Sequence, residues 1–557
     1  MNSIIFFLFV ILLQKNQKIF CYRCGADSIK KKPKKIEVKN DDDKRALSTD
    51  YTPINIKYDY TYLKVQNKLN SKDLNDLIQI FTDISEYLSS LFSVEHINLD
   101  INTKNIKEVC EIPYFSSDIQ NSLYTHDLLI FPMINMEMEE EVLAQAWTCL
   151  TINSNNRPIA GVVEVNPDFS LSKIDSDYYI KYLLMHEISH VLGFGFSFFQ
   201  ELNFIYTENK DGVIKNYLNS PKVVKRAKLH FNCENIKGVE LENQGGSGSA
   251  GSHWEARYML GDYMISTDYP EVTISDITLA YFEDTGFYKV NYYTGGLFRF
   301  GKNQGCSFLT ENCVKNNGKN TLFPNEFCTE TEAEEYFCGS SHISRGDCYI
   351  IDYDEKIDKK FRHFTNEYIG GFVAADYCPV SYSYYYEEYE ENYFYHYNCN
   401  YGLNIFNSMG EIIGENSLCF ESSLVPINNH NSLDELFSVC YKVQCDRDKK
   451  QVKIYIGNSI ITCPKNGGIL NNPNGFKGQI KCPNYNIICT SEIWCNELFD
   501  CIDKKSVADL NTFYYENYSE DTDDTEDEKK NKSPNISITL GLNKFIFILE
   551  FLILFLL

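Results

Sequence analysis

The two ends of the chain carry apolar runs that the rest of the sequence lacks. Residues 4–13 are all apolar, and polar residues 14–18 follow them. A run of that length is typical of a secretory signal peptide and is too short to span a bilayer, which takes about 20 residues. We therefore expect residues 1–21 to be a signal peptide and the mature chain to be extracellular.

The C-terminal run, residues 545–557, is apolar except for Glu550, and a polar, acidic segment precedes it. A polar spacer followed by a terminal apolar tail is typical of a glycolipid-anchor (GPI) signal. The alternative is a short transmembrane anchor, which Lys544 and Glu550 would make costly in the bilayer. We favour the lipid anchor, which would hold the protein at the cell surface.

In the middle of the chain, apolar and histidine side chains recur with the period of one helix face. Tyr179, Leu183, His186 and His190 are spaced by four, three and four residues. Two histidines at i and i+4 project together and can share one metal ion. Glu187 lies about 100° round such a helix, where its carboxylate can hold a metal-bound water without ligating the metal. The pattern therefore predicts a metal-binding helix.

This residue set is the one that metal-assisted peptide hydrolysis needs. A zinc ion lowers the pKa of its bound water toward about 7 and polarises the scissile carbonyl. A carboxylate such as that of Glu187 takes the proton of the water and can pass it to the leaving amine. The alternative is an amphipathic helix in which the histidines coincide by chance. The secreted, cysteine-rich context favours the metal-binding helix.

The twenty cysteines indicate an oxidising compartment. Fifteen of them lie between residues 298 and 501, and only three lie between residues 51 and 287. This contrast predicts a second domain that is stapled by disulfides. The net charge of −25 argues against a nucleic-acid partner, which requires a basic face.

A catalytic zinc site usually has three protein ligands, so one more is required. In the compact metzincin motif the third histidine would stand at position 196, which is Phe196 here. The third ligand is therefore remote, or the site is inactive. His253 stands out because it follows residues 245–252, which are all glycine, serine or alanine and let backbone and substrate approach closely. Met264, eleven residues later, lies where a metzincin Met-turn would be expected, although an isolated methionine is more often core filler.

These residues resemble those of the leishmanolysin-type (M8) surface metallopeptidases. The family has a long insertion before its third histidine, and here 62 residues separate His190 from His253. The resemblance covers residues 144–379 well and the remainder loosely. Three stretches are similar to the family's extended zinc motif, its third-ligand signature and the helix that closes its catalytic half: residues 186–193, 238–255 and 279–288.

The resemblance implies a zinc site with one Zn²⁺ per chain and the ligands His186, His190 and His253. It implies Glu187 as the general base and Met264 as the Met-turn. It also implies a zymogen in which a pro-segment cysteine occupies the open zinc position, and Cys24 is the residue that would do so. A thiolate is a good zinc ligand, so this cysteine switch is chemically sound.

The fold that we expect is α+β: a metzincin-type zincin catalytic domain with a long insertion before the third histidine ligand, plus a disulfide-rich C-terminal domain. Residues 157–165 are expected to form one strand of a mixed sheet. The expected divisions are a signal peptide (1–21), a pro-segment or linker with the cysteine switch (22–50), an N-terminal catalytic subdomain with the zinc helix (51–195), an insertion with the third ligand and the Met-turn (196–297), a Cys-rich C-terminal domain (298–505), an acidic polar stalk (506–535) and a hydrophobic anchor signal (536–557).

The function that follows is that of a zinc-dependent endopeptidase, secreted or at the cell surface, which hydrolyses peptide bonds of proteins or peptides. Its other partner would be the membrane, through the C-terminal anchor. Two alternatives stay open. One is a catalytically inactive surface adhesin or antigen on the same scaffold, and the other is a zincin in which a glutamate replaces His253 as the third ligand.

Overall fold

The described part of the chain runs, with gaps, from residue 23 to residue 489. The predicted signal peptide (1–21), stalk (506–535) and anchor (536–557) lie outside it. All described residues belong to one compact unit, residues 1–508. No helix among them is long and apolar enough to cross a bilayer. The computed structural model describes residues 23–24, 32–36, 51–96, 103–121, 126–138, 142–166, 177–210, 212–244, 249–267, 269, 271–292, 298–329, 336–339, 341–382, 386–387, 394–395, 399, 404, 406–414, 416–429, 435–446 and 448–489.

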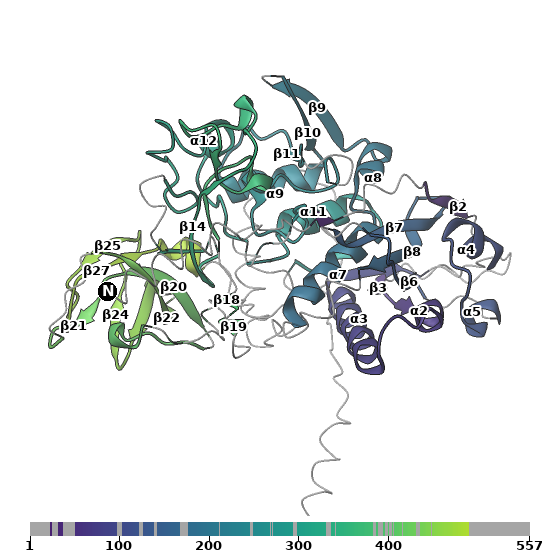
Figure 1. Cartoon of the computed structure of the whole chain (residues 1–557), viewed down its shortest axis with the longest axis horizontal. Helices are drawn as coiled ribbons and strands as arrows, with labels where there is room; N and C mark the ends of the chain where they lie inside the picture. The colour runs from purple at the N-terminus through teal and green to yellow at the C-terminus, as the bar shows by residue number, and fades with distance from the viewer. Residues whose placement is uncertain are drawn as a thin grey trace, which may run out of the picture. The chain divides into compact units, whose positions relative to one another are not determined.

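A six-stranded mixed sheet organises the N-terminal part of the chain (Figure 1). The strand order is β1-β7-β8-β6-β4, and β2 also pairs with β7. β7 and β8 run antiparallel, whereas the other pairs are parallel. The expected strand near residues 157–165 is β8. The strands are β1 Arg23–Cys24, β2 Lys34–Ile36, β4 Ile56–Tyr58, β6 Leu128–Ile134, β7 Val142–Ile152 and β8 Pro158–Val165.

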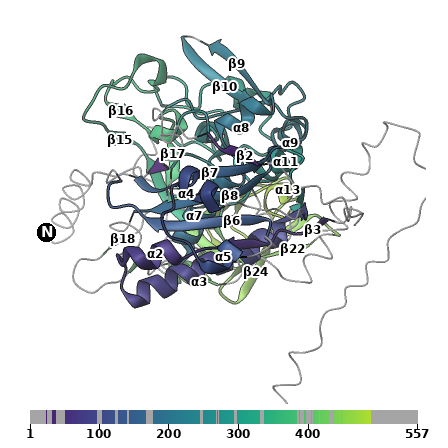
Figure 2. The ribbon, with the colours of Figure 1, turned by 90° about the vertical axis from the view of Figure 1, so that its right-hand side faces the viewer.

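Both faces of this sheet are buried. Along β6, Leu129 and Phe131 belong to one buried cluster, and Ile130 and Ile134 belong to another, because successive strand side chains point to opposite faces. Ile106 of α4 joins the first cluster. On the other face α7 packs against β7 and β8, beside which it lies in both views (Figure 1, Figure 2), and α3 packs against α7. The helices are α2 Thr61–Gln66, α3 Ser71–Leu91, α4 Thr103–Val109, α5 Ser117–Asn121 and α7 Asp177–Val191.

After α7 the chain forms short helices and a small three-stranded sheet, β11-β10-β9. Its hairpin β9–β10 projects from the body of the unit (Figure 1). Strand β12 leads back to the N-terminal part in a sheet of order β12-β5-β3. The elements are α8 Phe196–Glu201, β9 Ile205–Lys210, β10 Val213–Leu218, α9 Pro221–Phe231, β11 Val239–Glu240, α10 Ala256–Met259, α11 Asp276–Asp284, β12 Lys289–Val290, β3 Tyr51–Pro53 and β5 Phe92–Glu95.

The C-terminal part contains short strands and then an antiparallel six-stranded sheet of order β24-β23-β22-β20-β27-β25, which we call the C-terminal sheet. The strands of that sheet are β20 Ser417–Ser422, β22 Phe437–Asp446, β23 Gln451–Ile456, β24 Ser459–Thr462, β25 Gly468–Asn471 and β27 Gln479–Cys482. The other elements are α12 Cys306–Thr310, β13 Tyr336–Cys338, β14 Arg345–Tyr349, β15 Ile351–Asp352, η5 Lys359–Phe361, β16 Ile369–Gly370, η6 Val373–Ala375, β17 Val380–Tyr382, β18 Tyr386–Glu387, β19 Phe394–Tyr395, η7 Asn407–Met409, β21 Val425–Pro426, β26 Phe476–Lys477 and α13 Tyr485–Ile488.

The largest buried cluster, which we call the main core, extends from residue 54 to residue 380. The predicted domain boundary at residue 298 lies within it. There Phe308 stacks on Phe231, and the Cys233–Cys306 disulfide crosses the boundary. The described residues contain eight disulfides, so the expected mixture of helices, strands and many disulfides is confirmed: Cys110–Cys149, Cys233–Cys306, Cys313–Cys378, Cys328–Cys348, Cys338–Cys419, Cys399–Cys440, Cys445–Cys489 and Cys463–Cys482.

Candidate metal centre

Helix α7 ends in a tight cap that also fixes one of its histidines. Gly193 has φ +109°, a left-handed conformation that suits glycine. The amide of Gly193 donates to the carbonyl of His190 (3.1 Å), and that of Phe194 donates to the carbonyl of Ser189 (2.9 Å). This pair of bonds is a Schellman motif, which satisfies the last carbonyls of the helix. The cap turns the carbonyl of Phe194 back toward the ring of His190.

A second glycine lets this helix approach the sheet. A Cβ atom at Gly161 of β8 would lie 2.3 Å from Cγ1 of Val191, the last residue of α7. Thr148 of β7 donates its hydroxyl to the carbonyl of Val191 (2.8 Å). The end of α7 that carries His190 is therefore held against both β7 and β8.

Each of the three predicted histidine ligands is oriented by a backbone carbonyl. In every case Nδ1 donates the hydrogen bond, which fixes the proton there and leaves the lone pair of Nε2 for a metal. His186 and His190 come from α7, whereas His253 comes from the loop before α10. The acceptors are Tyr263 for His186 (2.6 Å), Phe194 for His190 (2.6 Å) and Ser249 for His253 (2.9 Å).

The three Nε2 atoms meet at one point. The distances are 3.0 Å between His186 and His190, and 3.2 Å from each of these to His253. Ligands 2.0–2.1 Å from a tetrahedral zinc lie about 3.3 Å from one another, so the spacing fits zinc. Three lone pairs that face each other in a buried site repel unless a cation lies between them. The donor set therefore fits zinc both in chemistry and in size.

Burial keeps these histidines neutral, the form that ligates a metal. It lowers the pKa of His186 to about 4 and that of His253 to about 3, and it holds the pKa of His190 well below its usual value. The neighbouring imidazoles lower the pKa values of His190 and His253 further. At neutral pH the cluster therefore presents uncharged imidazoles, with no proton to displace from Nε2.

Two further predicted site residues lie beside this cluster. Cys24 of β1 is buried and keeps its thiol, and its Sγ lies 3.4 Å from Nε2 of His190. Cys24 and the three histidines offer ligand atoms that all lie within 4.8 Å of one another. Glu187 is fully buried and follows His186 on α7. The structure thus brings Cys24 and the three histidines together, as expected from the sequence.

The turn that contains Met264 lies against the same cluster. Met264 is fully buried in the main core and follows Tyr263, whose carbonyl accepts the hydrogen bond from His186. Asp262 fixes the turn because its carboxylate accepts the amide of Met264 (2.8 Å) and the hydroxyl of Thr278 (2.7 Å). Sequence reasoning missed Asp262, although an aspartate between a glycine and a turn is a usual signal for such a bond.

The chain was compared with models of known protein families. A family model described as leishmanolysin, peptidase M8, matches residues 86–495. The chain belongs to the leishmanolysin family. The match includes the three histidines, Glu187 and Met264, whereas Cys24 precedes it. The resemblance seen in the sequence is thus confirmed.

Curated relatives of the leishmanolysin family match over part of their length. A leishmanolysin homolog of Crithidia fasciculata is 35% identical over 242 residues, 43% of this chain and 36% of the relative. Leishmanolysin of Leishmania tropica is 26% identical over 407 residues, 70% of this chain and 59% of the relative. A leishmanolysin-like peptidase of Drosophila pseudoobscura pseudoobscura is 27% identical over 422 residues, 63% and 61% of the two chains. The chain thus spans less than two thirds of these relatives.

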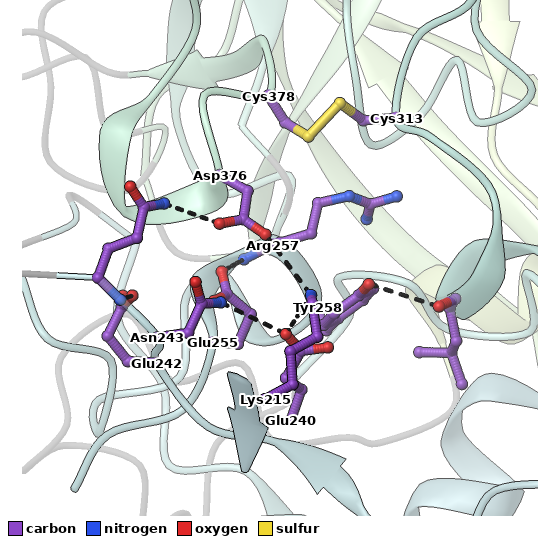
Figure 3. Close-up of polar contacts among 12 residues, drawn as sticks. Lys215, Glu240, Glu242, Asn243, Glu255, Arg257, Tyr258, Cys313, Asp376 and Cys378 are labelled. Carbon is purple, nitrogen blue, oxygen red and sulfur yellow. Dashed lines mark hydrogen bonds and ion pairs between the residues drawn. A yellow bond between two sulfur atoms is a disulfide. The ribbon is translucent and has the colours of Figure 1, made fainter. Parts of the chain in front are cut away.

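In this leishmanolysin-family chain, residues 240–243 contribute to a network of polar side chains (Figure 3) and also bond to the backbone around His253. The amide of Glu242 donates to the carbonyl of His253 (2.9 Å), and the amide of Glu255 donates to that of Glu240 (3.1 Å). Asn243 donates its side-chain amide to Glu255 (2.8 Å). Residues 239–243 therefore hold the backbone on both sides of His253.

Lys215 of β10 supplies positive charge to this network. Its ammonium pairs with the carboxylate of Glu240 and lies 4.0 Å from that of Asp376 (Figure 3). Burial lowers the pKa of Lys215, but Glu240 and Asp376 raise it by more, so the ammonium stays charged. Oxygens of Glu240, Glu255 and Asp376 lie within 4.8 Å of one another. Burial raises the pKa of Glu255 well above its usual value and also raises that of Glu240, which favours protons on this cluster.

Proposed function

We propose that the protein is a zinc-dependent endopeptidase that hydrolyses peptide bonds of proteins or peptides, with one Zn²⁺ per chain. The observation that carries the proposal is the meeting of three Nε2 lone pairs within 3.2 Å, each fixed by a carbonyl on the opposite ring nitrogen. Membership of the leishmanolysin family supports the reaction class. The proposed ligands are His186, His190 and His253.

Two residues besides the proposed ligands would have distinct roles in hydrolysis. Zinc, when bound, would acidify a water molecule and polarise the scissile carbonyl. Glu187 would act as the general base, taking a proton from the attacking water and delivering it to the leaving amine. The buried position of Glu187 keeps bulk water from competing for that proton. Met264 would pack against the histidine cluster as the Met-turn. We propose that the fold is that of a metzincin-type zincin.

Metal analysis and hydrolysis of casein or gelatin test this function on the purified protein, with Glu187→Gln as the matched variant. The wild type should contain one zinc per chain and hydrolyse the substrate after activation. Glu187→Gln should keep its zinc and lose activity by about 10²-fold or more, because only the base is removed. A wild type that holds zinc yet hydrolyses nothing under any activating condition would favour the adhesin alternative.

We also propose that Cys24 keeps the enzyme latent. Its sulfur lies 3.4 Å from Nε2 of His190, where its thiolate would occupy the metal position that the attacking water needs. Cys24→Ala should therefore raise the activity of the unprocessed protein toward that of the processed one, measured with the same substrate. Equal activity of wild type and variant before processing would contradict the cysteine switch.

The proposed location is the cell surface, through a signal peptide and a C-terminal lipid anchor. This proposal rests on the apolar runs at the two ends of the sequence, which lie outside the described residues. A phospholipase that cleaves glycolipid anchors should release the protein from intact cells into the medium. Retention in the membrane after that treatment would favour the short transmembrane anchor.

A further inference from the structure

Asp376 joins the Cys-rich part of the chain to the segment that carries His253. It follows η6 in sequence, and its carboxylate accepts the side-chain amide of Gln244 at 2.7 Å. The ammonium of Lys215 lies 4.0 Å from the other oxygen of the same carboxylate. Gln244 is the last described residue before residues 245–248, and Ser249 is the first one after them. Asp376 therefore holds the chain at Gln244, nine residues before His253.

The Asp376 side of this contact is rigid for three reasons. Its backbone has φ +54°, a left-handed conformation that aspartate tolerates better than most residues. The ring of His363 donates from Nε2 to the carbonyl of Asp376 (2.8 Å). Two residues later, the Cys313–Cys378 disulfide ties the chain to the segment after α12. A carboxylate mounted in this way is a fixed acceptor and not a surface group that adapts to its partner.

The Gln244 side of the contact leads directly to the ligand. The amide of Gln244 donates to the carboxylate of Glu242 (2.7 Å), and the amide of Glu242 donates to the carbonyl of His253 (2.9 Å). The carbonyl of Ser249 fixes Nδ1 of His253 (2.9 Å). Gln244 is thus connected to the backbone of His253 through Glu242.

We propose that Asp376 is a positioning residue for the third metal ligand, and that the Cys-rich part of the chain contributes to the metal centre through it. Residues that hold a ligand in place without touching the metal typically change metal affinity by 10–100-fold when they are replaced. Gln244, bonded to a charged acceptor, is the matched partner of Asp376. This inference rests on the proposed zinc site.

The test compares zinc affinity, by competition with a chelator, in the full-length wild type, Asp376→Ala, Asp376→Asn and Gln244→Ala. The control is Asp354→Ala, which removes an exposed carboxylate from the same part of the chain. Asp376→Ala and Gln244→Ala should each weaken zinc binding by about 10–100-fold. The double variant should bind no more weakly than the worse single one, because both lose the same contact. Asp376→Asn keeps the size and backbone preference and should lose less.

A second measurement does not depend on zinc. Amide hydrogen exchange in residues 239–244 and 249–255 should be faster in Asp376→Ala than in the wild type and unchanged in Asp354→Ala, with or without metal. Unchanged exchange, or zinc affinity equal to that of the wild type, would overturn the positioning role. A wild type that binds no zinc would overturn the proposed function instead, and the exchange measurement would still decide whether Asp376 holds this segment.

Discussion

The main core and the C-terminal sheet are stabilised in different ways. The main core is a large cluster of aliphatic and aromatic side chains, and the three buried histidines and the Asp262 carboxylate lie within the same part of the fold. The buried cluster of the C-terminal sheet is far smaller. Four disulfides each have at least one cysteine in a strand of that sheet: Cys338–Cys419, Cys399–Cys440, Cys445–Cys489 and Cys463–Cys482.

This difference indicates which region of the fold can bury the ionisable side chains of a catalytic site. Burying ionisable groups is costly unless they are paired or hydrogen-bonded, and a core with a large apolar surplus tolerates more of them at one site. A small sheet lacks that surplus, and cross-links that restrict the unfolded chain stabilise it instead. The main core should therefore be sensitive to changes in buried polar groups, whereas the C-terminal sheet should be sensitive to reduction.

The largest expected effect is confined to the main core. His253→Ala removes one of the three proposed ligands. Replacing a residue that only orients a ligand typically lowers metal affinity by about 10–100-fold, so the zinc affinity of this variant should fall by more than that. Hydrolysis should fall with it, while the protease resistance of the C-terminal sheet stays unchanged. Metal content and casein hydrolysis measure the first effect, and limited proteolysis measures the second. Full zinc content and full activity in this variant would favour a glutamate third ligand.

The next largest effect concerns two disulfides, one in each region, that close chain segments of nearly equal length. Removing them should affect the two regions differently. Cys399–Cys440 in the C-terminal sheet closes 41 residues, and Cys110–Cys149 in the N-terminal part closes 39. Because a disulfide lowers the entropy of the unfolded chain, each of the two should contribute about 4 kcal/mol to the free energy of unfolding. Replacing the first pair by serines should unfold the C-terminal sheet, detected as new protease cleavage after residue 399.

Replacing the second pair by serines serves as the matched control. It should lower the denaturant midpoint while leaving the N-terminal part folded, because apolar clusters cover both faces of the mixed sheet there. If both double variants unfolded locally to the same extent, the two regions would not differ in the source of their stability.

A smaller effect concerns pH and His230 of the main core. His230 is buried and donates from Nε2 to the carbonyl of Phe300 (2.7 Å), and burial, followed by Lys302, lowers its pKa to about 4. The unfolded chain binds the proton first, at about 6.5, so this contribution to stability is complete above 6.5 and is lost as the pH falls toward 4. Between pH 8 and pH 5 the loss is about 2 kcal/mol.

His230→Gln should flatten the pH dependence of the free energy of unfolding by that amount, as measured by denaturant titration. His342 bonds to the carbonyl of Cys419 in the C-terminal sheet, and its pKa is also lowered to about 4 by burial. Because burial lowers both pKa values to about 4, His342→Gln should flatten the curve by about the same amount. A clearly smaller change in one of the two variants would mean that the two regions differ in how they bury a neutral histidine.

The smallest effect should be equal in the two regions. Lys181–Asp83 joins α7 to α3 at 3.1 Å, and Lys453–Asp446 joins neighbouring strands of the C-terminal sheet at 3.0 Å. Both pairs are partly exposed, so replacing either lysine by alanine should lower the unfolding temperature only slightly and to a similar extent. Thermal unfolding of both variants measures this. A clearly larger loss in one region would extend the contrast from the interior to the surface.

Much of the metal centre followed from local sequence signals, and the rest depended on long-range contacts. The spacing of His186 and His190 placed both on one face of a helix, and Phe196 excluded the compact motif. No periodicity linked His253 to that helix, and only the glycine-rich segment before it and the family resemblance indicated it. The supports of the site, such as Tyr263 and Asp376, act through backbone carbonyls or from distant parts of the chain, which sequence patterns do not reveal.

The elements of the fold also differ in whether local sequence signals predict them. The strand at residues 157–165 was evident because both faces of a central strand are apolar, whereas the hairpin β9–β10 was missed. Its strand β9 is largely exposed, so it lacks the alternation of buried and polar positions that indicates a strand. Disulfide partners likewise depend on three-dimensional proximity, which cysteine counts do not contain.

The pairing of β1 and β2 with β7 has a consequence for the handling of this protein. Both strands come from residues 22–50, and they pair with the two ends of the outer edge of β7, a strand of 11 residues. If processing removes that segment, the backbone amides and carbonyls of a long, apolar strand lose their partners. Unpaired edges of this kind join to other chains and promote aggregation. The unprocessed form should therefore be the more soluble one to store, with activation carried out shortly before use and at low concentration.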